Sequence, residues 1–172
     1  MRVAHRVRQF FHALKVRDDP TLPLVLRAYL NPAEESLFLR QSPTDQRHAV
    51  MVFKRLRVEG GNSSVLLRAA LLHDVGKTVG VIRLWHRVVY VLLSRAIPSL
   101  LELITNESDG WRQPFWVLKR HAALGAALAR EIGVEPAVVE LIANHHRPLH
   151  CATMNIENLD LLAKLQKADE EI

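Results

Sequence analysis

The sequence has one cysteine, Cys151, and little glycine or proline, with 7 and 8 residues respectively in 172. A single cysteine closes no internal disulfide and supplies no cysteine-based zinc site, so both are excluded, and a reducing compartment, the cytoplasm, is expected. Since 49% of the residues are apolar, collagen-like, low-complexity and broadly disordered chains are also excluded. The length predicts one globular domain.

Long apolar runs are missing as well. The longest uncharged stretches lie between Arg87 and Glu102, and Arg95 interrupts them, so none reaches the roughly 20 residues of a membrane span. Arginine and histidine interrupt the first ten residues, so we expect no secretory signal there. Residues 1–17 contain no acid, and the chain carries 23 Lys and Arg against 18 Asp and Glu. This balance mildly favours anionic ligands.

No stretch alternates polar and apolar residues long enough to predict a strand, so the sequence predicts an all-α fold of about seven to nine helices. An apolar stripe from Val3 to Leu14 indicates a basic amphipathic helix at the N-terminus. Asn31 is a candidate N-cap followed by Pro32, and Pro98 divides the apolar segment 80–107 into two helical pieces. The remaining helices are expected near residues 22–30, 32–39, 43–57, 63–72, 114–132, 136–145 and 156–172.

The chemistry is concentrated in histidine and aspartate residues. His73 and Asp74 are adjacent in the segment LLHDVGK, and imidazole and carboxylate together suit borderline divalent metals such as Zn, Fe, Mn, Co or Ni. Other candidates lie in or beside apolar helical stripes, where a helical core would bring them together: His48, His121, His145, His146 and Asp169. Gly125, four residues after His121, would let another backbone approach closely.

This ordered series resembles the HD superfamily of metal-dependent phosphohydrolases over about residues 43–172. The resemblance implies an all-helical domain in which a first metal ion is bound by His48, His73, Asp74 and Asp169. In the dinuclear branch of the family a second ion would be bound by His121 and His145, with Asp74 bridging. His146 would be a ligand or a substrate contact, and Lys77, which matches the lysine of the HDxGK motif, would lie near the substrate phosphate.

The sequence also departs from one known branch. Arg147-Pro148 follows His145-His146, in place of the motifs of the HD-GYP cyclic-dinucleotide phosphodiesterases. The extent of the resemblance also divides the chain. We interpret residues 43–172 as the HD-type domain, residues 80–112 within it as a variable helical insert, and residues 1–42 as a helical extension packed on the core. The apolar part of this insert, Leu84 to Leu101, is interpreted as a cover on the core, a membrane-interfacial lid or a dimer contact.

The expected activity is hydrolysis of a nucleotide or another small phosphate ester with two bound divalent metal ions. In this scheme Asp74 is the bridging anion, and Lys77, Arg147 or His146 stabilises the phosphate charge or protonates the leaving group. The same ligands would serve a di-iron oxygenase, and a sensor or scaffold with a structural metal is the non-enzymatic alternative. The basic N-terminal helix is interpreted as a binding element for nucleic acid or a membrane surface, or as a helix that packs on the domain. The sequence also leaves open whether the protein forms a homodimer.

Overall fold

The computed structural model describes residues 22–172. Within them the chain forms nine α-helices and no strand, so the expected all-α fold is confirmed. The predicted helix spanning Val3 to Leu14 lies outside the described residues. The helices are α2 (Leu22–Tyr29), α3 (Pro32–Leu39), α4 (Pro43–Val58), α5 (Ser64–Leu72), α6 (Leu84–Ala96), α7 (Pro98–Ile104), α8 (Gln113–Glu131), α9 (Pro136–Asn144) and α10 (Ile156–Glu171).

Local capping fixes several of the helix starts. Asn31 accepts hydrogen bonds from the backbone N–H groups of Ala33 and Glu34, and the Glu34 carboxylate accepts one from the N–H of Asn31. This is the capping box that satisfies donors without an intrahelical partner. At the starts of α4 and α5, the side chains of Ser42 and Ser63 each accept a hydrogen bond from a backbone N–H, that of Asp45 and of Leu66 respectively. The predicted boundaries of these helices are therefore close to the observed ones.

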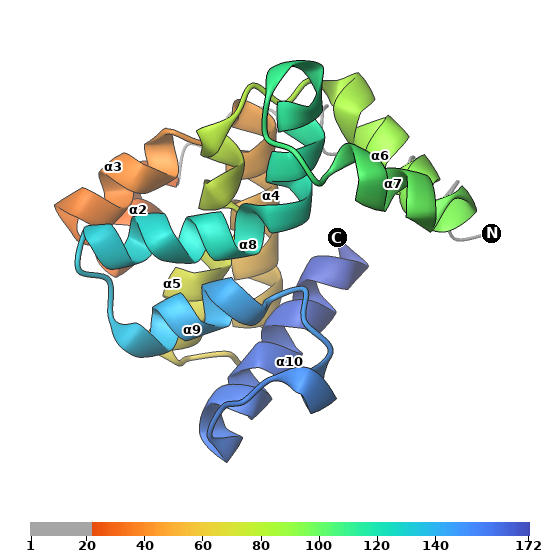
Figure 1. Ribbon diagram of the computed structural model, residues 1–172. Helices are drawn as coiled ribbons and strands as arrows, with labels where there is room; N and C mark the ends of the chain where they lie inside the picture. The colour runs from red at the N-terminus through yellow and green to blue at the C-terminus, as the bar shows by residue number, and fades with distance from the viewer. Residues whose placement is uncertain (1–21) are drawn as a thin grey trace.

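Helix α5 is the centre of the core. Most of its residues are buried, and it contacts α3, α4, α9 and α10, which surround it in Figure 1. A helix that is apolar on nearly all sides is stable only when other helices enclose it. Helices α2 and α3 join the same core through Leu26, Leu37 and Phe38.

Helices α6 and α7 meet at Pro98, as the sequence predicts. They contact each other, and α6 also packs on α8, so that the pair extends from the side of the molecule opposite α2 and α3 (Figure 1). Among residues 22–172, no helix combines the length and the apolar character that crossing a bilayer requires.

Candidate metal centre

Five segments far apart in the sequence deliver the candidate ligands to one place. His48 lies on α4, His121 on α8 and Asp169 on α10. The pair His73-Asp74 lies where α5 ends, and a short 3-10 helix (Val75–Val79) follows it. His145 and His146 directly follow Asn144, the last residue of α9. The distances below show that all seven predicted side chains come together.

The first group joins α4, α5 and α10. Nε2 of His48 lies 2.7 Å from Oδ1 of Asp169, and Nε2 of His73 lies 3.5 Å from the same oxygen. The three ligand atoms lie within 4.8 Å of one another. His73 is buried, and its Nε2 has no hydrogen-bond partner. A buried nitrogen that has no hydrogen-bond partner and lies near a carboxylate is suited to serve as a ligand of a cation.

The second group joins α8 and the end of α9. Nε2 of His121 lies 3.2 Å from Nε2 of His145 and 3.0 Å from Nε2 of His146. The three ligand atoms of this group also lie within 4.8 Å of one another. Three imidazole nitrogens aimed at one point are an arrangement that divalent transition metals accept.

Asp74 lies between the two groups. Its Oδ2 is 3.6 Å from Nε2 of His73, whereas its Oδ1 is 3.3 Å from Nε2 of His121 and 3.9 Å from Nε2 of His145. The two oxygens of one buried carboxylate therefore face different histidine groups. This is the geometry that a carboxylate bridging two cations needs.

Backbone carbonyls orient three of the rings. Nδ1 of His73, His121 and His145 lies 2.9, 2.7 and 2.7 Å from the carbonyl oxygen three residues earlier in each case. A carbonyl only accepts, so each Nδ1 carries a proton and donates it. Each Nε2 is then the atom left to bind a proton or a metal ion, as is usual for metal-binding histidines whose other nitrogen is hydrogen-bonded.

The electrostatics of the cluster favour bound cations. Burial alone raises the pKa of Asp74, but Lys77, His73 and His121 hold it well below its usual range. Burial likewise raises the pKa of Asp169, while its hydrogen bond with His48 and the charge of the nearby His73 hold it well below the usual range. Both carboxylates are therefore charged at neutral pH. Burial lowers the pKa of His73, yet the charges of Asp74 and Asp169 raise it to about 9.

A close backbone approach places Asp74 against α8. A Cβ atom on Gly76 would lie 1.9 Å from the carbonyl oxygen of His121 and 2.5 Å from the backbone nitrogen of Gly125. Only glycine permits this contact. The expectation that Gly125 allows another backbone to approach is confirmed, and the partner is the HDxGK segment itself.

Two charged pairs border the cluster. Lys77 donates to Oδ2 of Asp74, so it occupies the place of a cation beside that oxygen. Arg87 on α6 donates to both carboxylate oxygens of the buried Asp45, over 2.6 and 2.7 Å. Sequence reasoning missed this second pair. The one available signal was that Asp45 precedes His48 by three residues and so lies on the same side of α4.

A small hollow of about 240 Å³ opens beside the ligands. Its lining includes His145, His146 and Asp169 together with Arg147, whose side chain is exposed. Gln166 donates to the carbonyl oxygen of Arg147 over 2.7 Å and holds this turn against α10. The hollow gives a small molecule a route to the cluster past a cationic side chain.

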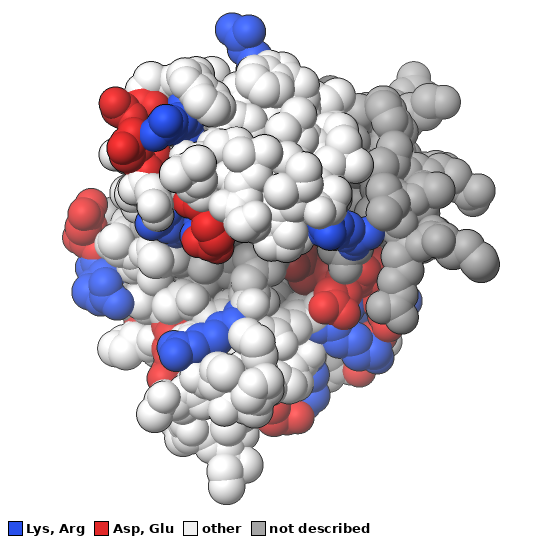
Figure 2. Space-filling view, turned by 45° about the vertical axis from the view of Figure 1, so that its right-hand side comes forward, with Lys and Arg blue, Asp and Glu red and all other residues white. Residues whose placement is uncertain are grey.

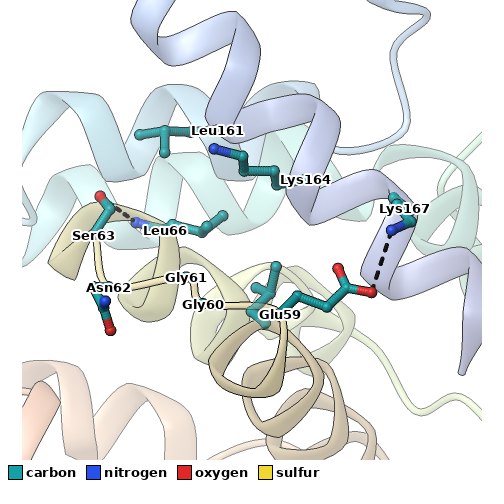
Figure 3. Close-up of a pocket in the computed structure, with 10 residues that line it drawn as sticks. Glu59, Gly60, Gly61, Asn62, Ser63, Leu66, Leu161, Lys164 and Lys167 are labelled. Atoms are coloured by element: carbon teal, nitrogen blue, oxygen red, sulfur yellow. Dashed lines mark hydrogen bonds and ion pairs between the residues drawn. The ribbon is translucent and has the colours of Figure 1, made fainter.

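A second hollow, of about 520 Å³, lies elsewhere, at the Gly60-Gly61 turn (Figure 3). Two lysines of α10 line it, but Lys167 pairs with Glu59 over 3.2 Å and Lys164 pairs with Asp160 over 2.6 Å. Their charges are thus neutralised, and no candidate ligand of the cluster lines this hollow. The chemistry belongs to the histidine and aspartate cluster.

Comparison with known proteins agrees with this assignment. The family model described as HD domain matches residues 46–170, which include every candidate ligand. No curated protein and no solved structure shows significant similarity to the chain.

Proposed function

The chain belongs to the HD-domain family, and we propose that it is a metal-dependent phosphohydrolase acting on a nucleotide or another small phosphate ester. The observation that carries the proposal is the position of Asp74 between two groups of histidines, with one oxygen toward each. The first ion would be held by His48, His73, Asp74 and Asp169, and the second by Asp74, His121 and His145. His146 is a further ligand of the second ion or a contact for the substrate.

Bound divalent ions would supply Lewis-acid stabilisation of the phosphoryl oxygens and lower the pKa of a water molecule toward neutrality. The chain itself binds and orients the substrate. Arg147 at the hollow presents a guanidinium fork that matches two phosphate oxygens. Lys77 donates to Asp74, and with cations bound at Asp74 its ammonium group would be available to neutralise negative charge on the phosphate.

His146 differs from the other histidines of the cluster because it is exposed. It lines the hollow beside Arg147, where a leaving group would depart toward solvent. An imidazole at this place is suited to giving a proton to the leaving oxygen. Catalysis would therefore use Asp74, Lys77 and His146, with Lys77 and Arg147 binding the phosphate.

The test begins with elemental analysis of protein purified without added metal. It continues with release of phosphate or a phosphomonoester from phosphomonoesters, nucleotides and cyclic dinucleotides in the presence of Mn, Co, Ni or Fe(II). Asp74→Asn should lower metal content and reduce turnover more than about 100-fold, the upper range for residues that only position a ligand. The exposed Asp109 gives the matched control, and Asp109→Asn should leave both unchanged.

Full metal occupancy without hydrolysis of any of these substrates would contradict the proposal. Iron-dependent oxygen consumption under the same conditions would assign the cluster to the di-iron oxygenase class. Metal that is retained without either activity would assign it to a structural role.

A further inference from the structure

The outer side of the α6–α7 pair is apolar. Apolar residues at helical spacing on α6 are exposed, and so are apolar residues of α7 and of the connections. About half of the large apolar side chains that are exposed in residues 22–172 lie in this segment. We call the following set the outer apolar face: Leu84, Trp85, Val88, Val91, Leu92, Ile97, Leu100, Leu103 and Trp111.

The spacing of this set matters more than its size. Leu84, Val88, Val91 and Leu92 follow the i, i+4, i+7, i+8 pattern of the stripe by which a helix normally packs on a core. Here the stripe is exposed, and Leu92 shows 51% of its surface. The opposite side of α6 makes the inward contacts, because His86 is buried and its ring stacks edge-on against Phe115 of α8. Helix α6 therefore packs inward through polar side chains, and its apolar stripe lacks a partner in the described structure.

The charge pattern identifies the partner. Residues 75–101 contain no acid, whereas Arg83 and Arg95 are exposed at the two ends of α6. Among the acids that follow, Glu102 is paired with Lys119 and Glu107 with Arg112, whereas the exposed Asp109 lies beyond the end of α7. Two copies of α6 placed together would bring Arg83 and Arg95, which form no ion pair within residues 22–172, against a segment, residues 75–101, that offers no acid. A partner with an apolar interior and an anionic surface would accommodate both the exposed apolar side chains and the exposed arginines.

We propose that the outer apolar face docks on anionic lipid bilayers, with α6 lying in the plane of the interface. Leu92 and its neighbours would enter the boundary between headgroups and acyl chains, and Arg83 and Arg95 would extend to lipid phosphates. Trp85 and Trp111 are exposed beside Phe115 of α8, and their amphipathic rings suit this depth. Figure 2, turned so that this side comes forward, shows a broad uncharged surface with charged side chains at its margins.

Docking leaves the candidate metal centre in place. Arg87, on the inward side of α6, stays bound to Asp45, and no ligand of the cluster belongs to the outer apolar face. The proposal therefore does not depend on the phosphohydrolase activity, and its test needs no substrate.

The experiment is flotation of the full chain with phosphatidylcholine vesicles, with and without 30% phosphatidylglycerol. The protein should float with the anionic vesicles, and added salt should weaken the binding. Val88→Glu/Leu92→Glu should lower the bound fraction about tenfold or more. Val58→Glu/Ile156→Glu is the matched control, because Val58 and Ile156 are even more exposed (84% and 87%) but lie on α4 and α10; it should bind like the unmodified protein.

A second readout locates the contact. The chain has three tryptophans, so Trp111→Phe/Trp116→Phe leaves Trp85 as the single fluorophore. Its emission should shift to the blue on anionic vesicles, and brominated lipids should quench it. Vesicle binding without quenching of Trp85, or binding unaffected by Val88→Glu/Leu92→Glu, would assign the contact to the basic residues 1–17 and overturn the proposal.

Measurement of mass in solution completes the test. A monomer is expected in the absence of lipid. A dimer that Val88→Glu/Leu92→Glu dissociates, together with no flotation, would assign the face to a second copy of the chain and overturn the proposal.

Discussion

His48 and Asp169 lie 121 positions apart in the sequence, yet Nε2 of His48 is 2.7 Å from Oδ1 of Asp169. This contact ties the start of α4 to the end of α10, on either side of α5. The two helices also pack against each other. The first group of ligands is therefore complete only when the whole domain has folded.

Removing the charge of Asp169 should weaken binding at this first group. Asp169→Asn keeps the size of the side chain but loses a carboxylate that holds its negative charge at neutral pH. A charged hydrogen-bonding partner contributes about 1.5–3 kcal/mol, so metal affinity should fall roughly 10- to 100-fold. Asp160→Asn, on the exposed side of the same helix, is the control. Equal affinity of the two variants in a metal titration would contradict the assignment of Asp169.

Metal binding should release protons. The pKa of His73 is raised to about 9, so at pH 7.5 the metal-free ring is mostly protonated, and a metal ion must displace that proton from Nε2. Calorimetric titration in buffers of different ionisation enthalpy should give release of roughly one proton per ion bound at the first group, and affinity that increases up to about pH 9. His73→Gln should abolish the release, whereas His150→Gln, at an exposed site, should not. A binding enthalpy independent of the buffer would contradict this prediction.

The raised pKa also sets the sign of a stability effect in the metal-free protein. Since the folded value for His73 exceeds the unfolded one, its contribution is complete below about pH 6.5 and is lost as the pH rises toward 9. His145 acts in the opposite direction. Burial and the neighbouring His73 and His146 hold its pKa well below the usual range, so the folded state loses stability as the pH falls below about 6.5.

The sequence was a good guide to the helices and to the set of converging residues. Asn31, Ser42 and Ser63 mark helix starts through local hydrogen bonds that depend on a few adjacent residues. The order of the histidines and aspartates indicated the candidate ligands, because the matching family pattern already contains the long-range arrangement. The division of these residues into two groups with Asp74 between them required coordinates.

Other features depend on contacts that no local pattern encodes. The pair Asp45 and Arg87 joins α4 to α6 over 42 positions, and residues 80–112 follow no pattern that would indicate it. The apolar segment 80–107 predicted two helical pieces correctly, but an apolar pattern does not tell whether a helix side faces the core or solvent. In the structure, Val88 and Leu92 of α6 are exposed.

Gly76 should be among the least replaceable residues of the chain. Gly76→Ala would place a Cβ atom 1.9 Å from the carbonyl oxygen of His121, so α8 or the HDxGK segment must shift, at a cost of about 3 kcal/mol or more in unfolding free energy. In Gly80→Ala the nearest atom is a methyl group of Val117 at 3.0 Å, so the neighbour must move by only a few tenths of an ångström, and a loss below about 1 kcal/mol is expected. Similar losses for the two variants in urea denaturation would show that the backbone contact is not tight.

The pair Asp45 and Arg87 should stabilise the protein far more than an exposed pair. Burial raises the pKa of Asp45, but the hydrogen bonds from Arg87 and the charge of Lys77 hold it below the usual range. Arg87→Met would leave a buried, charged carboxylate without its partner and should cost about 3–5 kcal/mol in unfolding free energy. Arg112→Met, which breaks the exposed pair with Glu107, should cost less than about 1 kcal/mol. Asp45→Asn in the Arg87→Met background should recover much of the loss, because the penalty comes from the unpaired charge. A double variant no more stable in urea than Arg87→Met alone would instead attribute the loss to packing of the arginine side chain between α4 and α6.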